Sequence, residues 1–291
     1  MNFAKKAATS LLIFLMAASV GLAGCSRPEP AKPAEAPAAK GNAPQEQAPA
    51  ADDSLARVKA AGKLVAGLDD AFPPFGFRNE KNELVGFDID LGNELAKRLG
   101  VKMEWQPTEW SSVIMSLKSK KFDVIWSGMS ITEERKKEIN FSIPYIAGAQ
   151  IIIVKSDNKT INSRKDLVGK VVGTQLGSTG EEAAKRELKG LKELKTFDVF
   201  TEAINDLNIG RLDAVVIDDV TANYYLKTKP GAFRIVEDVL SYEPTGIGVR
   251  KEDVTLLEAI NKELKAMIED GTYAKISERW FGTDMSKHLP K

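Results

Sequence analysis

The sequence predicts an α/β fold whose folded body has two lobes. From about residue 54 onward, strand-like and helix-like runs alternate along the chain, as they do in α/β folds. The 291 residues are 43% apolar, which is enough for a sizeable core. Two turn-like clusters, at residues 142–148 and 241–246, indicate changes of direction. They would divide the body into a discontinuous first lobe and a continuous second lobe.

Residues 1–24 have the pattern of a signal peptide. Lys5 and Lys6 give the segment a positively charged beginning, and the apolar run that follows is shorter than a transmembrane helix requires. The run ends in Leu-Ala-Gly before Cys25, which is the only cysteine. This ending resembles the lipobox of bacterial lipoproteins, and the resemblance implies cleavage before Cys25 and lipid attachment to its sulfur. The alternative is a plain signal peptide with an incidental cysteine.

Residues 25–53 are expected to form a tether after the lipidated cysteine. From residue 26 the segment is rich in alanine and proline and has no aromatic or β-branched side chain. Such a composition cannot bury enough apolar surface to fold. The folded body is therefore expected to begin near Ser54.

The expected strands and helices follow from apolar runs and from helical spacing. Short apolar runs predict buried strands at residues 64–68, 122–126, 151–154, 170–172 and 213–217. Residues 88–99 have apolar side chains at helical spacing and stop at Gly100, and residues 113–117 suggest the next helix. The last long helix is expected at about 254–269, ending before Gly271.

The composition argues against several classes of function. The single histidine, His288, and the single cysteine make a histidine-based catalytic triad or a His/Cys zinc site very improbable. The formal net charge is zero, which gives no electrostatic footprint for nucleic acid. The chain has no phosphate loop or dinucleotide fingerprint. We therefore expect a binding protein and not an enzyme, with no cofactor, no metal and no nucleic-acid partner.

Residues 127–135, SGMSITEER, have the pattern of an anion-binding turn. Gly128 between serines suits a tight exit from a strand, where the backbone approaches a ligand closely. Thr132 is expected to cap a charged helix, with acidic residues in its first turn. Arg135 could hold a carboxylate through two parallel hydrogen bonds. The alternative is an ordinary loop, a capped helix and a solvated arginine.

Six stretches in a fixed order resemble the polar amino-acid-binding proteins of ABC importers, bacterial solute-binding protein family 3. They are DDAFPPF at 69–75, VGFDIDL at 85–91, SGMSITEERKKEINF at 127–141, QLGST at 175–179, DAVVID at 213–218, and GTY to WFG at 271–282. The resemblance extends from about residue 55 to 283. Its motifs are most similar to those of the lysine/arginine/ornithine- and glutamine-binding branches.

The resemblance implies a two-lobed clamshell of the periplasmic-binding-protein type. Each lobe would be a mixed, mostly parallel sheet flanked by helices, and two crossover strands would form the hinge. The first lobe would comprise residues 54–145 and 245–291, and the second lobe residues 146–244. One ligand would bind in the cleft, with hinge closure on binding. A monomer is expected.

The resemblance also implies the ligand contacts. Arg135 would meet the carboxylate of a free amino acid, and Asp218 in the second lobe would meet its ammonium. The other contacts implied for these two groups are Ser127, Gly128, Ser130, Ser178 and Thr179. Backbone N–H groups at the capped helix start near Thr179 favour a carboxylate. Without the resemblance, Asp218 would be an ordinary helix N-cap.

The pocket for the ligand side chain is implied by four further positions. Phe72 and Trp110 match two aromatic positions that sandwich the side chain in relatives. Asp69 matches a position that contacts the distal polar group, and its carboxylate disfavours glutamate and aspartate. The role of Gln175 is open. Arginine, lysine or ornithine is the favoured ligand, and glutamine or cystine is the alternative.

Three functional hypotheses follow from these features. The first is an extracytoplasmic lipoprotein that captures a polar amino acid and delivers it to an ABC permease driven by separate ATPase subunits. The second, an enzyme on the same fold, is a cyclohexadienyl-type dehydratase, which would need a general acid in the cleft. The third is a receptor module that acts through a separate signalling partner.

Overall fold

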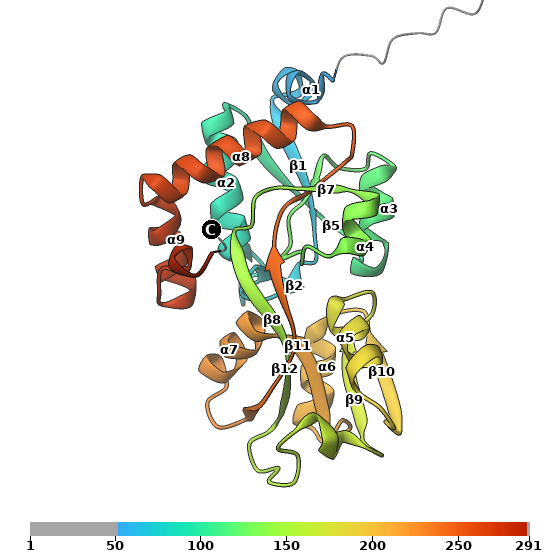
Figure 1. Cartoon of the computed structure of the whole chain (residues 1–291). Helices are drawn as coiled ribbons and strands as arrows, with labels where there is room; N and C mark the ends of the chain where they lie inside the picture. Colours follow the sequence, from blue (N-terminus) through green and yellow to red (C-terminus); the bar gives the residue numbers. More distant parts are fainter. Residues whose placement is uncertain (1–51, 290–291) are drawn as a thin grey trace, which may run out of the picture. The chain divides into compact units, whose positions relative to one another are not determined.

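The computed structural model describes residues 52–289, whose main strands form two five-stranded sheets (Figure 1). The predicted signal peptide, Cys25 and all of the predicted tether before residue 52 lie outside the described residues. The first sheet has the order β5 (Lys102–Pro107), β1 (Lys63–Leu68), β6 (Val124–Ile125), β13 (Gly248–Val249) and β7 (Asn140–Phe141). The second has the order β10 (Glu193–Phe197), β9 (Val171–Gln175), β11 (Ala214–Asp218), β8 (Ile146–Lys155) and β12 (Phe233–Thr245). We call the parts built on these sheets the first and second lobes.

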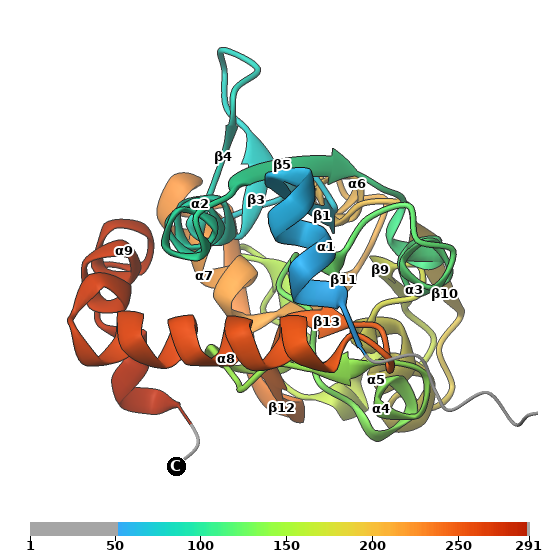
Figure 2. The ribbon, with the colours of Figure 1, turned by 90° about the horizontal axis from the view of Figure 1, so that it is seen from above.

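Helices cover both faces of the first sheet. One face is covered by α1 (Ser54–Ala61), α2 (Phe87–Leu99), α8 (Val254–Glu269) and α9 (Thr272–Phe281), as Figure 2 shows. The other side of the lobe contains α3 (Val113–Lys118) and α4 (Glu133–Glu138). In α2 the predicted apolar spacing buries Ile89, Leu91 and Leu95, and the helix ends at Gly100. The predicted helix at 254–269 is confirmed as α8, but the ten-residue α9 follows it and was not predicted.

The second sheet is also buried on both faces, which explains its continuous apolar strands. Along β8, Ile152 and Val154 face α5 (Thr179–Glu187), while Ile151 and Ile153 face α6 (Phe200–Asn208) and α7 (Asp219–Thr228). The remaining short elements are β2 (Ala71–Phe72), β3 (Gly76–Arg78), β4 (Leu84–Val85), and three 3-10 helices at Trp110–Ser112, Arg164–Leu167 and Met285–His288.

The two long strands β8 and β12 connect the lobes. They pair antiparallel from Ile146 opposite Thr245 to Lys155 opposite Phe233. The prediction of turns is therefore wrong for residues 146–148 and 241–245, which are extended and belong to the paired strands, whereas residues 142–145 lie outside any strand. Gly148 and Pro244 do not end these strands, because β8 and β12 pair with each other through both positions.

Gly86 sets the angle at which the chain enters α2. Its φ is +143°, a region that only glycine adopts readily, and a Cβ there would lie 2.1 Å from the carbonyl oxygen of Phe75. Gly86→Ala is expected to lower the free energy of unfolding by about 2–4 kcal/mol through strain and overlap. Urea unfolding measures this. Gly100→Ala is the matched control: φ is +77° but the space is open, so its cost should stay near about 1–2 kcal/mol. Equal effects of the two substitutions would contradict the steric argument.

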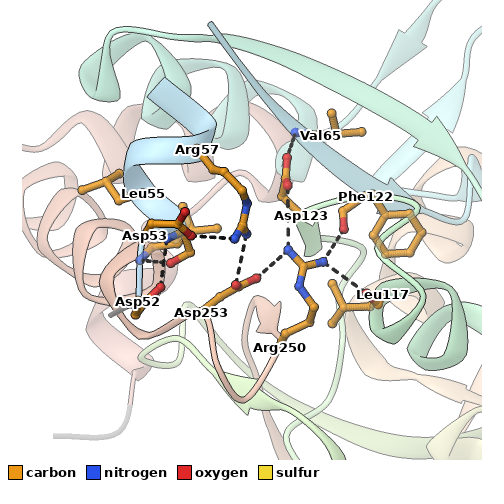
Figure 3. A network of polar contacts seen from close by, with 12 residues as sticks. Asp52, Asp53, Leu55, Arg57, Val65, Leu117, Phe122, Asp123, Arg250 and Asp253 are labelled. Carbon is orange, nitrogen blue, oxygen red and sulfur yellow. Dashed lines mark hydrogen bonds and ion pairs between the residues drawn. The ribbon is translucent and has the colours of Figure 1, made fainter. Parts of the chain in front are cut away.

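The start of α1 is bound to the start of α8 by a network of polar contacts (Figure 3). Asp52 accepts hydrogen bonds from the backbone N–H groups of Ser54 and Thr255. Arg57 contacts Asp253 at 3.2 Å, and Asp253 contacts Arg250 at 2.5 Å. The side chains of Arg250 and Asp253 are 3% and 2% exposed. The chain therefore joins the folded body at the first lobe, beside a buried ion pair. Within residues 52–289, no helix is long and apolar enough to span a membrane.

Candidate ligand-binding site

A cavity of about 270 Å³ lies between the two lobes. It is lined by Asp69, Phe72, Trp110, Ser127, Gly128, Ser130, Arg135, Gln175, Ser178, Thr179, Phe200 and Asp218. All eleven binding residues predicted from the sequence are among them, and Phe200 is the one addition. The residues up to Arg135 belong to the first lobe and the others to the second.

The loop after β6 gives the first-lobe side of the cavity its shape. Gly128 has a φ of +56°, and a Cβ there would lie 2.8 Å from the ring of Phe72, so glycine suits this position on both counts. The Gly128 N–H donates to the buried carboxylate of Asp88 at 2.8 Å, and Asp88 also accepts from the Tyr145 hydroxyl at 3.1 Å. Burial raises the pKa of Asp88 to about 7. The loop is thus fixed from behind by the start of α2.

Arg135 is a buried cation without a carboxylate partner in the described part of the chain. It lies on α4, which Thr132 caps as predicted. Its guanidinium donates to the carbonyl oxygens of Ser130, at 3.0 Å, and Gly177, at 3.3 Å, and lies 5.5 Å from the centre of the Trp110 ring. Arg135 is 8% exposed, and no carboxylate of residues 52–289 lies within 4.0 Å of its nitrogens. Such a group suits an incoming carboxylate.

The start of α5 forms the opposite wall. Ser178 is its N-cap, and its hydroxyl accepts from the Glu181 N–H at 3.1 Å, as the predicted capping pattern requires. The Thr179 hydroxyl lies 3.2 Å from the Ser130 hydroxyl, so these two side chains meet across the lobes. Hydroxyls and helix N–H groups therefore surround the region beside Arg135 with hydrogen-bond donors.

Asp218 is the anion of the second lobe. It occupies the N-cap position of α7, but its side chain makes no capping hydrogen bond. Its carboxylate instead accepts from the Gln150 amide at 2.8 Å. Burial raises the pKa of Asp218 to about 7, the nearby charge of Glu243 adds to the rise, and the hydrogen bond from Gln150 opposes it. A cation bound at Asp218 would stabilise the ionised carboxylate.

At the Asp69 side of the cavity, polar groups of both lobes meet beside aromatic rings. The Gln175 amide donates to Asp69 at 2.7 Å, and Phe72 and Phe200 stack with ring centres 5.6 Å apart. Burial raises the pKa of Asp69. Phe200 was not predicted, because its spacing with the apolar residues of α6 predicts a core role. Trp110 lines the cavity and lies against Arg135, and Phe200 is the cavity ring that stacks on Phe72.

Other predicted assignments concern neighbours of the cavity. Asp70 pairs with Arg78 at 2.7 Å and does not line the cavity. Trp126 is fully buried in the core. Among residues 52–289, no group of three or more histidine, cysteine, aspartate or glutamate residues could hold a metal ion. Gln150 was not among the predicted residues.

The profile of one protein family, "Bacterial extracellular solute-binding proteins, family 3", matches residues 64–283. An L-cystine-binding protein of Escherichia coli strain K12 is 36% identical over 239 residues, which cover 81% of this chain and 90% of that protein.

Two solved structures of ancestral proteins are also similar to the chain. One is an ancestral arginine-binding protein bound to arginine, with 50% identity, a TM-score of 0.72, and coverage of 76% of this chain and 98% of the other. The second is an ancestral amino acid-binding protein described as a precursor of cyclohexadienyl dehydratase, with 43% identity, a TM-score of 0.75, and coverage of 78% and 99%.

Proposed function

The chain belongs to the bacterial extracellular solute-binding proteins of family 3, and on this premise we propose that it captures a polar amino acid with a cationic side chain. Arginine, lysine and ornithine are the favoured ligands. Glutamine and cystine remain the alternatives, and the cystine-binding relative supports keeping the latter. Capture would precede delivery to an ABC permease and its ATPase subunits.

One observation carries the proposal: a buried cation and a partly buried carboxylate line the same cavity from opposite lobes. Arg135 and Asp218 match the carboxylate and the ammonium of a zwitterion. A ligand with only one of the two charges would leave the other group without a charged partner. The cost of such burial favours free amino acids over simple acids or amines.

Asp69 supports the preference for a cationic side chain. Asp69 is 5% exposed, and its carboxylate accepts from the backbone N–H of Ala71 and from the Gln175 amide of the other lobe, neither of which is charged. A guanidinium or ammonium would give it a full charge partner, whereas the Phe72 and Phe200 rings would hold an apolar stem. A neutral carboxamide could compete with Gln175 for the same oxygen, which keeps glutamine as the alternative.

The same proposal includes the predicted organisation of the chain. The first lobe would comprise residues 54–145 and 245–291 and the second residues 146–244, which agrees with the sheet to which each strand belongs. Residues 1–24 would be removed, and the protein would be held at the outer surface of a membrane by lipid on Cys25 through the tether of residues 25–53. The protein is proposed to act as a monomer.

A thermal-shift screen of residues 52–291 against the twenty amino acids, ornithine, citrulline and cystine tests the proposal. A ligand that binds only the folded state raises the melting temperature. The largest shifts are expected with arginine, lysine or ornithine. In Asp69→Asn the affinity for these three should fall by about 10- to 100-fold, because a hydrogen bond to a charged group is lost. Asp70→Asn, outside the cavity, is the matched control.

The screen has informative alternative outcomes. A shift with glutamine or cystine alone would overturn the cationic preference and keep amino-acid capture. The absence of any shift would contradict amino-acid capture itself.

A dehydratase is the second candidate, since one similar structure is a precursor of such an enzyme. The cavity favours binding over this chemistry, because none of its lining residues is a glutamate and its two aspartates have hydrogen-bonded amide partners. Incubation of the purified protein with a hydroxylated cyclohexadiene acid should yield no aromatic product above the uncatalysed rate. Turnover would favour the enzyme.

A further inference from the structure

Gln150 lies behind the cavity and contacts both of its charged regions. It belongs to β8, one of the two strands that connect the lobes, and is 1% exposed. Its Nε2 atom donates to the carboxylate of Asp218 at 2.8 Å and to the hydroxyl of Thr179 at 3.1 Å. The Thr179 hydroxyl in turn meets the Ser130 hydroxyl, and Arg135 donates to the backbone carbonyl oxygen of the same Ser130. Gln150 therefore contacts the anion of the second lobe directly and lies two residues away from the cation of the first.

We propose that Gln150 is a positioning residue that sets the direction of hydrogen bonding at Thr179 and at Asp218. Thr179 would then donate to the ligand carboxylate, and Asp218 would accept from the ligand ammonium. The inference rests on the proposed function and adds a residue that does not line the cavity. One amide would thereby prepare the site for a zwitterion in a single orientation.

The argument at Thr179 concerns its hydroxyl. A hydroxyl has one O–H to donate and two lone pairs to accept with. Thr179 accepts from Gln150 on the inner side, so one lone pair is occupied there. If Thr179 also accepts from the Ser130 hydroxyl, which lies 3.2 Å away, its O–H points to a ligand in the cavity. A donor is what a ligand carboxylate beside Arg135 requires.

The argument at Asp218 concerns its charge. Nε2 satisfies Oδ1, which leaves Oδ2 for the ligand ammonium. The reverse orientation of the amide would place its carbonyl oxygen against the carboxylate and favour the protonated acid. Three other charged groups influence Asp218: Glu243 from β12 and Asp219 from α7 oppose its ionisation, and Arg135 from α4 favours it. Gln150 is thus a neutral donor in a place where two of the neighbours are anions.

Gly180 leaves room for the head group of Gln150. A Cβ at Gly180 would lie 3.0 Å from Oε1 of Gln150 and 2.8 Å from the Thr174 hydroxyl, so the bare glycine leaves room for the Gln150 head group. Oε1 is buried and has no hydrogen-bond partner among the described residues. The hydrogen bonds that hold the head group are therefore those of Nε2, to Asp218 and Thr179.

Gln150→Met tests the proposal, because it keeps the length of the side chain and removes the N–H donors. Binding of L-arginine, L-glutamine and L-cystine is measured by calorimetry from pH 5.5 to 8.5. Wild-type affinity should fall as the pH drops through about 7, where Asp218 becomes protonated. In Gln150→Met the affinity should be about 10- to 100-fold lower at pH 7. The pH below which binding weakens should also move upward, because the hydrogen bond that lowers the pKa of Asp218 is lost.

Thr221→Val is the matched control, since Thr221 is fully buried on α7 in the same lobe and its hydroxyl has no partner among the described residues. It should leave both the affinity and the pH profile unchanged. A double substitution with Thr179→Val should cost less than the sum of the two single changes.

The outcomes separate this inference from the proposed function. If the wild type binds one of the three amino acids and Gln150→Met binds it equally well, the role of Gln150 is contradicted and the proposed function stands. If Gln150→Met binds more weakly but its affinity depends on pH as that of the wild type does, Gln150 acts through packing alone, and this result would also overturn the inference. If the wild type binds no amino acid, both proposals fall.

Discussion

Replacing Arg135 by alanine is expected to weaken amino-acid binding by about a hundred- to several-thousand-fold. The guanidinium is buried between the lobes, and its hydrogen bonds within residues 52–289 go to two carbonyl oxygens and to no carboxylate. Without it, a bound ligand carboxylate would stand in the closed cavity without a charged partner. Removing one partner of a buried pair costs about 3–5 kcal/mol, which is the stated loss of affinity.

Two further variants make this test specific. Arg135→Lys keeps the charge but loses the planar fork, so affinity should recover only in part. Lys136→Ala, on the same helix but in an exposed pair with Glu133, should bind as the wild type does. Calorimetric titration with arginine measures all three variants. Unchanged affinity in Arg135→Ala would contradict the assignment of the carboxylate site.

The second large effect is expected on stability, from Asp253→Ala. Asp253 pairs at 2.5 Å with Arg250, and both side chains are almost completely buried. The Arg250 guanidinium also donates to the carbonyl oxygens of Leu117 and Phe122, which fixes it in place (Figure 3). Loss of the carboxylate leaves this cation buried without its closest counter-charge. The free energy of unfolding should fall by about 3–5 kcal/mol, measured by urea denaturation.

The double substitution Arg250→Met with Asp253→Leu distinguishes the loss of one charge from the loss of the whole ion pair. Removing both charges leaves no unpaired ion, so this variant should be more stable than Asp253→Ala. The exposed pair of Lys63 and Glu104 provides the surface control, and Glu104→Ala should cost less than about 1 kcal/mol. If Asp253→Ala were as mild as Glu104→Ala, the buried pair would have no special part in stability.

The residues that line the cavity could be predicted because they belong to short motifs at the ends of strands. Gly128 stands in the loop after β6, Arg135 stands in the first turn of the next helix, α4, and Asp218 ends β11. Local spacing and resemblance are enough to identify such residues. The contacts between the lobes, such as Gln175 with Asp69, became visible only in the folded structure.

The features that the sequence did not reveal depend on tertiary contacts. Phe200 has the pattern of a core residue on an amphipathic helix, and only the position of that helix brings its ring to Phe72. Gln150 stands within an apolar strand, where a single polar residue has no local signature. The connecting strands were misread as turns because Gly148 and Pro244 favour turns locally, while pairing between β8 and β12 decides their conformation.

The position of β13 in the first sheet has a consequence for the order of folding. The second lobe is built from one continuous run of chain, so nearly all of its contacts are available once β12 has been synthesised. The first sheet, in contrast, receives β13 between β6 and β7 only after the chain has passed through the whole second lobe. Closing so long a loop is entropically costly and slows non-local pairing. The first lobe, whose strands are synthesised first, is therefore the last to complete its folding, because its sheet lacks β13 until the C-terminal segment has been made.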